Sequence, residues 1–221
     1  MMGKKASVFL VSLLLLIGLS KQDAFDYFQV VHEWQPAICN LGNSCKIQPK
    51  NEFGIHGVWP SVYSKGQIGP CCGPSFDPLK IISLQDRMNQ YWKDLENGNS
   101  IEAWASKWEM HGTCSAAGFD QFKYFCLGLD TYGRHAIFSF LDREGLAPSS
   151  SKYVAKASFI TAIANSTLKK GGVICAVDQY RRIQLQKAVL CYVKDGHTLI
   201  DCPDNVSSSC PDNFVWLALG D

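Results

Sequence analysis

Two histidines in this sequence lie in similar short motifs and have the residue type that acid–base catalysis needs. His56 lies in the segment Phe53–Pro60 and His111 in the segment Trp104–Cys114; each is followed by glycine and is close to a tryptophan. Two imidazoles at one site can act as general base and general acid near neutral pH. Such a pair suits metal-free cleavage of RNA, in which one removes the 2′-hydroxyl proton and the other protonates the leaving 5′-oxygen. The residues alone allow a second interpretation, in which both histidines only pack or form structural hydrogen bonds.

The elements that must position these motifs follow from the hydrophobic pattern. Because the expected strands and helices are segregated along the chain, we predict an α+β fold with a central antiparallel sheet and several helices. Asp195-Gly196 predicts a hairpin turn. The expected helices run from Ser83 to Asn97, from a cap at Ser100 to Gly112, and over 119–129, 135–143 and 152–165; the expected strands cover 28–34, 173–177, 183–193 and 198–202.

The composition favours one folded domain behind a secretory leader. Residues 1–20 contain Lys4 and Lys5, a long apolar run and a small-residue cleavage site, so we expect a signal peptide there, with a cut after Ala24 as an alternative. The 221-residue chain is 47% hydrophobic, and no second apolar run approaches the roughly 20 residues that a membrane span needs. We therefore expect residues 21–221 to form a single soluble domain that is secreted or vacuolar.

The charge balance argues against a protein that coats nucleic acid or adheres to membranes. The chain has 21 Lys and Arg against 20 Asp and Glu, and removal of Lys4 and Lys5 leaves 19 against 20, a formal charge of −1. Both of these functions need clustered basic residues. The balance still permits a local nucleotide site, so we expect RNA as a weak partner, no membrane association and no obligate protein partner.

The even number of cysteines behind an expected signal peptide predicts a disulfide-rich protein. A zinc site is the alternative, but the sequence contains neither a C-x-x-C pair nor an H-x(3–5)-H pair, so we expect no metal and no cofactor. Sequons at Asn165 and Asn205 predict glycans on surface loops. The ten cysteines are Cys39, Cys45, Cys71, Cys72, Cys114, Cys126, Cys175, Cys191, Cys202 and Cys210.

The two histidine motifs resemble those of the ribonuclease T2 family, especially its plant S-like and S-ribonuclease branch. The first family motif reads F-x-I-H-G-L-W-P, which this chain matches with Val58 in place of leucine. The second reads H-E-W-x-K-H-G-T-C, and Trp108 and the run His111–Cys114 match it. The resemblance implies an α+β fold with an antiparallel sheet, no metal, and cleavage through a 2′,3′-cyclic phosphate by His56 and His111.

The second motif departs from the family at three positions beside its histidine. The family histidine, glutamate and lysine fall on Ser106, Lys107 and Met110. Positions 107, 110 and 111 share one face if the segment is helical, so an ammonium and a thioether stand where the family presents a carboxylate and an ammonium. Lys107 would lower the pKa of nearby imidazoles, and the loss of a phosphate donor typically costs about 10²–10³ in rate.

The resemblance also assigns roles to residues outside the second motif. Glu33 stands at the position where the family often has a glutamine associated with base binding, and Trp59 is a candidate for stacking on a base or for the core. The family pairing implies the bridges Cys39–Cys45, Cys175–Cys210 and Cys191–Cys202. It leaves Cys114 and Cys126 each to take one of the adjacent Cys71 and Cys72.

Three functions remain from the sequence. The first is a secreted ribonuclease T2-like storage or defence protein with little or no ribonuclease activity. The second is an active endoribonuclease that uses His56 and His111 with altered neighbours. The third is a pollen-recognition S-ribonuclease, which the charge of −1 disfavours because members of that group are usually basic. The altered positions beside His111 favour the first.

Overall fold

The computed structural model describes residues 25–42 and 45–219, so the expected leader at 1–20 lies outside the described residues. Eight strands form one sheet with the order β3-β2-β1-β6-β8-β4, and β5 and β7 also pair with β6. Neighbouring strands are antiparallel except β6 and β8, which run parallel at Gln184 and Val215. The strands are β1 (Tyr27–Trp34), β2 (Phe53–Val62), β3 (Gly66–Gln67), β4 (Ser149–Ala155), β5 (Gly172–Val177), β6 (Ile183–Val193), β7 (Leu199–Ile200) and β8 (Asn213–Trp216).

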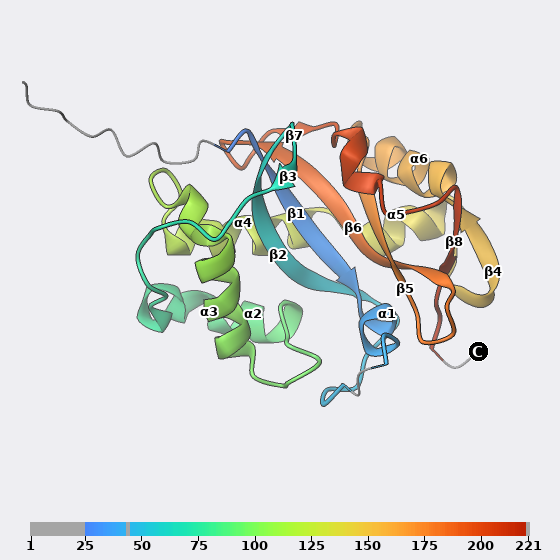
Figure 1. Ribbon diagram of the computed structural model, residues 1–221, viewed down its shortest axis with the longest axis horizontal. Helices are drawn as coiled ribbons and strands as arrows, with labels where there is room; N and C mark the ends of the chain where they lie inside the picture. Colours follow the sequence, from blue (N-terminus) through green and yellow to red (C-terminus); the bar gives the residue numbers. More distant parts are fainter. Residues whose placement is uncertain (1–24, 43–44, 220–221) are drawn as a thin grey trace, which may run out of the picture.

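Helices pack around this sheet, with α2 and α3 beyond its β2 side and α5 and α6 near β4 and β8 (Figure 1). The mixture of one sheet and several helices confirms the predicted α+β class. None of the helices in the described part of the chain is long and apolar enough to cross a membrane. The helices are α1 (Gln35–Cys39), α2 (Gln85–Tyr91), α3 (Ser100–Met110), α4 (Gln121–Arg134), α5 (Ile137–Arg143) and α6 (Lys156–Thr167), with 3-10 turns η1 (Pro78–Leu84), η2 (Gly112–Ser115) and η3 (Asp204–Ser207).

Strand β1 is buried along its whole length and sends side chains to both faces of the sheet. Successive side chains of a strand point to opposite faces. Phe28, Val30 and Trp34 accordingly join the main core with α4, whereas Tyr27 and Val31 join a smaller cluster with Trp59, Val189, Cys191, Cys202 and Val206. The alternation also separates the adjacent polar pair, His32 and Glu33, onto opposite faces.

Helix α3 is held against the sheet by its tryptophans and their indole hydrogen bonds. Trp104 and Trp108 are buried in the main core. Trp104 Nε1 donates to Trp92 O at 2.8 Å, and Trp108 Nε1 donates to Pro74 O at 2.7 Å. A Cβ at Gly112 would come within 2.2 Å of the Trp108 ring, so only glycine fits where the helix ends. The ring therefore fixes the position of the neighbouring His111.

Several expected boundaries were wrong because tertiary contacts overrode local pattern. The helix expected at 152–165 begins at Lys156, since residues 153–155 pair with β8. The helix expected to reach Asn97 ends at Tyr91, and the Asp94 carboxylate accepts the next N–H groups, those of Glu96 and Asn97. Asn99, not Ser100, caps α3. Strands β2, β3, β4 and β8 and the short helix α1 were not predicted.

The structure contains four disulfides, and the expected fifth bridge is wrong. Three bonds follow the family pairing: Cys39–Cys45, Cys175–Cys210 and Cys191–Cys202. Cys71 pairs with Cys114, while Cys72 is an exposed free thiol and Cys126 on α4 is a half-buried free thiol. The bond to Cys71 occupies the only sulfur of Cys114, so the adjacent Cys72 is left as an exposed free thiol.

Both sequons lie on helical turns, so the expectation of loops was wrong. Asn165 is exposed on the last turn of α6, and Asn205 is exposed on η3. Nδ2 of Asn205 donates to Tyr63 O at 3.3 Å. Exposure at both positions remains compatible with glycan attachment, which stays a prediction.

Candidate active site

Strands β1, β2 and β6 bring three polar side chains to one face of the sheet. Glu33 on β1 stands directly opposite Lys187 on β6. A register shift in β1 between Val31 and His32 accompanies the pairing with β2, on which His56 lies. Cross-strand neighbours lie within side-chain reach of one another. The sheet therefore assembles a carboxylate, an imidazole and an ammonium from segments distant in sequence.

Both ring nitrogens of His56 are engaged. Glu33 Oε2 lies 2.7 Å from His56 Nδ1, and Lys107 Nζ on α3 lies 3.3 Å from His56 Nε2. An ammonium can only donate, so Nε2 accepts from Lys107 and Nδ1–H donates to the Glu33 carboxylate. Burial lowers the pKa of His56 well below the usual histidine value, and Lys107, Lys187 and His111 lower it further. The imidazole is therefore neutral near pH 7.

Glu33 carries the negative charge of this cluster, and its surroundings shift the pKa of its carboxyl in opposite directions. Burial raises the pKa of its carboxyl to about 7, and the positive charges of Lys107 and Lys187 act in the opposite direction. The pKa of Lys107 and that of Lys187 are both lowered by burial, and Glu33 opposes that shift in each case. The Glu33 carboxylate thus stabilises the charged forms of Lys107 and Lys187 and hydrogen-bonds His56, so these four side chains are electrostatically coupled.

Lys107 reaches His56 because α3 is fastened to β2. The Tyr124 hydroxyl on α4 lies 2.7 Å from Val58 O and 3.3 Å from Lys107 O, so it bridges the two elements. Burial raises the pKa of Tyr124 far above the usual tyrosine value, so the hydroxyl stays protonated and donates. The contact between the Lys107 and His56 side chains is therefore built on fixed backbone positions.

His111 lies just past the end of α3 and joins the same cluster. Its backbone N–H donates to Lys107 O at 3.1 Å, and Nδ1 lies 3.5 Å from Ile68 O. Burial lowers the pKa of His111, the hydrogen bond to Ile68 O opposes this shift, and Lys107 adds to it. The structure thus brings the two predicted histidines to one place, each beside the same indole ring.

That indole belongs to Trp59, which lies close to both histidine rings. Its ring centroid lies 5.6 Å from that of His56 and 5.8 Å from that of His111, and Lys187 Nζ lies 5.9 Å from it. Trp59 is only 8% exposed and belongs to the smaller core cluster. A ring so buried offers little free face to a base, so its position supports the core role that the sequence left open.

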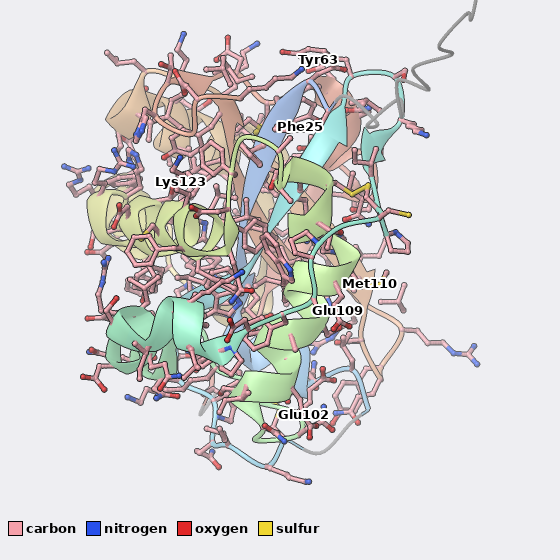
Figure 2. All side chains as sticks on the ribbon, turned by 90° about the vertical axis from the view of Figure 1, so that its left-hand side faces the viewer. Phe25, Tyr63, Glu102, Glu109, Met110 and Lys123 are labelled. Atoms are coloured by element: carbon pink, nitrogen blue, oxygen red, sulfur yellow. A yellow bond between two sulfur atoms is a disulfide. The ribbon has the colours of Figure 1, made fainter. Side chains whose placement is uncertain are left out.

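The three altered positions of the second motif do not share one environment. Lys107 contacts His56, and Ser106 lines the cleft beside it. Met110 is 44% exposed at the end of α3, and Figure 2 shows it near the last turn, with Glu102 at the opposite end of the helix. Since α3 stops at Met110 and His111 leaves the helical conformation, the expected common face of 107, 110 and 111 does not form.

A cleft of about 330 Å³ opens beside His56, and we name it the His56 cleft. Its lining contains more acidic than basic side chains: the carboxylates of Glu33, Asp94, Glu96 and Glu102 against the ammonium groups of Lys93 and Lys107. An acidic lining repels a polyanion and lowers its local concentration. The charge of the cleft therefore disfavours RNA.

Sequence reasoning missed Lys187 and three of these carboxylates. The register that places Lys187 opposite Glu33 depends on strand pairing, which the sequence does not display. The sequence between Trp92 and Trp104 contains Asp94, Glu96 and Glu102. Charged residues in such a segment normally indicate solvent exposure rather than a site. Within the described residues, no three His, Cys, Asp or Glu side chains form a group that could hold a metal ion.

Comparisons with known proteins agree on one family. The family model for the Ribonuclease T2 family matches residues 25–202. Ribonuclease MC from Momordica charantia is 32% identical over 197 residues, which are 87% of this chain and 100% of that protein. Extracellular ribonuclease LE from Solanum lycopersicum is 30% identical over 216 residues, covering 92% of this chain and 93% of the relative.

A solved structure has the same fold. Ribonuclease MC1 from the seeds of bitter gourd superposes with a TM-score of 0.80 at 31% identity, covering 86% of this chain and 100% of that one. A mutant of the same enzyme has been solved in complex with 5′-GMP, again with a TM-score of 0.80 and 31% identity, over 86% of this chain and 99% of that one.

Proposed function

This chain belongs to the Ribonuclease T2 family, and we propose that it is a member that binds RNA weakly and cleaves it slowly. One observation carries the proposal: Lys107 Nζ lies 3.3 Å from Nε2 of His56. Cleavage needs one imidazole to accept the 2′-hydroxyl proton and the other to protonate the 5′-oxygen. His56 holds its Nδ1 proton against Glu33 and directs its Nε2 lone pair at a lysine. It is therefore poorly placed for either step.

The electrostatics of the site point in the same direction. An acid that donates to the leaving oxygen must carry a proton, but burial and the nearby Lys107 both lower the pKa of His56. Removal of Lys107 from Nε2 would be required before substrate could approach. The acidic lining of the His56 cleft further weakens the binding of phosphates.

A second function, active endoribonuclease, is supported by a separate observation. A carboxylate, two ammonium groups and two imidazoles still gather around Trp59, although Glu33 and Lys187 stand on strands rather than on α3. In this reading His56 and His111 cleave RNA through a 2′,3′-cyclic phosphate, and Lys187 or Lys107 contacts the phosphate. The site would then be rearranged rather than impaired.

We propose further that the protein enters the secretory pathway and serves in storage or defence. The support is the leader-like segment at 1–20, the four disulfides and the two exposed sequons. One relative is named extracellular ribonuclease LE, which fits this pathway, and another is named intracellular ribonuclease LX. Quantitative proteomics of the source tissue checks the storage role, which requires the protein to be among the most abundant there.

A direct rate comparison tests slow cleavage. Purified protein and ribonuclease MC are incubated with the same yeast RNA, and acid-soluble nucleotides are measured over time. Because one active-site donor is typically worth about 10²–10³ in rate, we expect this protein to be at least about 10²-fold slower. His56→Ala should leave the small residual rate nearly unchanged. Equal rates, abolished by His56→Ala, would instead establish the second function.

A further inference from the structure

Three side chains at the His56 cleft form a series of contacts that ends in a primary amine. Lys107 Nζ lies 3.3 Å from His56 Nε2, and Glu33 Oε2 lies 2.7 Å from His56 Nδ1. Nucleophile, imidazole and carboxylate in this order activate the serine of many hydrolases, because the carboxylate orients the imidazole and the imidazole takes the proton of the nucleophile. In this protein the group at the nucleophile position is the amine of Lys107.

This series of contacts lies in the wall of the cleft and is open to a small molecule. Lys107 is half-buried and lines the cleft together with His56 and Glu33. The side chains of His56 and Glu33 keep 20% and 11% of their surface exposed. The volume of about 330 Å³ exceeds the roughly 150 Å³ of an engineered cavity that holds benzene. A small organic molecule in the cleft therefore meets these side chains.

The surroundings of Lys107 favour a nucleophilic amine. Burial lowers the pKa of Lys107, and the carboxylates of Glu33, Glu96 and Asp94 oppose that shift. A lowered pKa leaves more free amine near neutral pH, and desolvation is one way in which proteins make a lysine react with carbonyl compounds. The other titratable groups around this part of the site are Lys93 and Glu102 in the cleft lining, His111 after α3 and Lys187 on β6.

We propose that Lys107 binds small aldehydes covalently as imines, an activity that goes beyond RNA cleavage, and that uncharged or cationic aldehydes react in preference to anionic ones. The acidic lining of the His56 cleft supplies this preference, because it repels anions.

The reaction requires no oxidant and no reductant. The free amine of Lys107 adds to the carbonyl carbon and forms a C–N bond. Both amine protons then pass to the carbonyl oxygen, the C–O bond breaks, and the products are an imine and one water molecule. His56 Nε2 lies where it can carry these protons, and the Glu33 carboxylate stabilises the imidazolium that forms between the two transfers.

Reductive trapping tests the proposal. Purified protein is incubated near pH 7 with sodium cyanoborohydride, which reduces an imine to a stable secondary amine, and with butanal, 4-(trimethylammonio)butanal or succinic semialdehyde. These aldehydes have the same chain length and are neutral, cationic and anionic. Peptide mass spectrometry compares the labelling rate of Lys107 with that of Lys93, a second lysine in the cleft lining. Because acid–base assistance is typically worth about 10²–10⁴ in rate, we expect butanal to label Lys107 at least about tenfold faster. Succinic semialdehyde should be the slowest of the three.

Variants assign the reactivity to the contact with His56. His56→Gln keeps a hydrogen-bond acceptor beside Lys107 but cannot take up a proton, so labelling of Lys107 should fall to the rate of Lys93. His197→Gln removes an exposed histidine outside the cleft and should leave the labelling of Lys107 unchanged. If His56→Gln folds poorly, the comparison of Lys107 with Lys93 in the wild-type protein still decides.

Three results would overturn the proposal. They are labelling of Lys107 no faster than that of Lys93, a wild-type labelling rate in folded His56→Gln, and a preference of Lys107 for succinic semialdehyde. The experiment contains no RNA, so its outcome is independent of the cleavage rates that test the proposed function.

Discussion

His56 and His32 lie on adjacent strands, His56 partly exposed and His32 buried, and they differ in their partners. His56 has Glu33 at Nδ1 and Lys107 at Nε2, whereas His32 has no hydrogen-bond partner among the described residues at either nitrogen. Burial is the largest cause lowering the pKa of both rings. Burial alone therefore does not decide what a histidine can do. Protein groups engage both nitrogens of His56, whereas both nitrogens of His32 are buried and unpaired among the described residues.

The surroundings of His56 and of His32 differ because β1 sends successive side chains to opposite faces of the sheet and because different elements pack on each face. Glu33 and His32 are neighbours in β1 and face opposite sides of the sheet. On the Glu33 side, β2, β6 and α3 each deliver a charged or polar group. On the His32 side, the lining consists of aromatic rings such as Tyr132, whose hydroxyl is engaged, together with His135 and the Glu52 carboxylate, which accepts from Gln35. Exchanging partners, rather than moving the histidines, should therefore interconvert their behaviour.

The largest expected effect follows from freeing His56. Lys107→Glu combined with Met110→Lys replaces the ammonium at Nε2 by a carboxylate, which raises the pKa of His56 and restores a family-like second motif. We expect RNA cleavage to rise by one order of magnitude or more, approaching about 10²-fold. The yeast RNA assay measures this change, and Ser106→His can be added to recover a phosphate contact.

The controls separate this contact from a general change of charge. Lys93→Glu makes the same charge change in the lining of the His56 cleft without touching His56, and it should give no gain. Adding His56→Ala to the Lys107→Glu, Met110→Lys protein should abolish the gain. A folded variant that stays inert would place the defect elsewhere, at Glu33 or in the acidic lining.

The next largest effect concerns the cost of protonating His32. Its pKa is about 3 in the folded protein against a usual 6.5, so the unfolded chain binds a proton first and stability falls as pH drops below 6.5. At pH 5 this amounts to about 2 kcal/mol, from about 1.4 kcal/mol per pH unit. His32→Phe lacks this loss, so its free energy of unfolding should fall less between pH 7 and pH 5.

Urea unfolding at the two pH values measures this difference, because all other titrating groups are shared by both proteins. His197→Gln provides the matched control, since His197 is exposed at the turn between β6 and β7. It should track the wild-type protein. If the free energy of unfolding fell by the same amount in the wild-type protein and in His32→Phe, His32 would become protonated in the folded protein, and its pKa would not be lowered.

The smallest expected effect tests the coupling around His56. Glu33 raises the pKa of Lys107 and that of Lys187 against the lowering caused by burial. Glu33→Gln should therefore lower both pKa values further. NMR titration of the lysine side chains measures this change. Unchanged Lys107 and Lys187 titrations would contradict the electrostatic coupling to Glu33.

Local pattern was sufficient for four of the strands, β1, β5, β6 and β7, and for the two histidine motifs, but not for β2, which carries His56. Alternation predicted β1, and β-rich runs predicted β5 and β6 close to their observed bounds. Local pattern failed where a contact with another element decides the secondary structure or the pairing of a residue. Residues 153–155 have helical neighbours in sequence but pair with β8, and Cys72 and Cys126 are both free thiols although the sequence favoured bridges for both.

The sequence by itself determined the family, the sheet-and-helix class and the presence of Lys107 in place of a glutamate. Those features depend on residue identity and on short spacings, both of which can be read directly from the sequence. Only the tertiary structure decided that Lys107 meets Nε2 of His56, that Lys187 stands opposite Glu33, and that His32 is left unpartnered. Each of these is a contact between segments far apart in the sequence, and strand register and helix docking set such contacts.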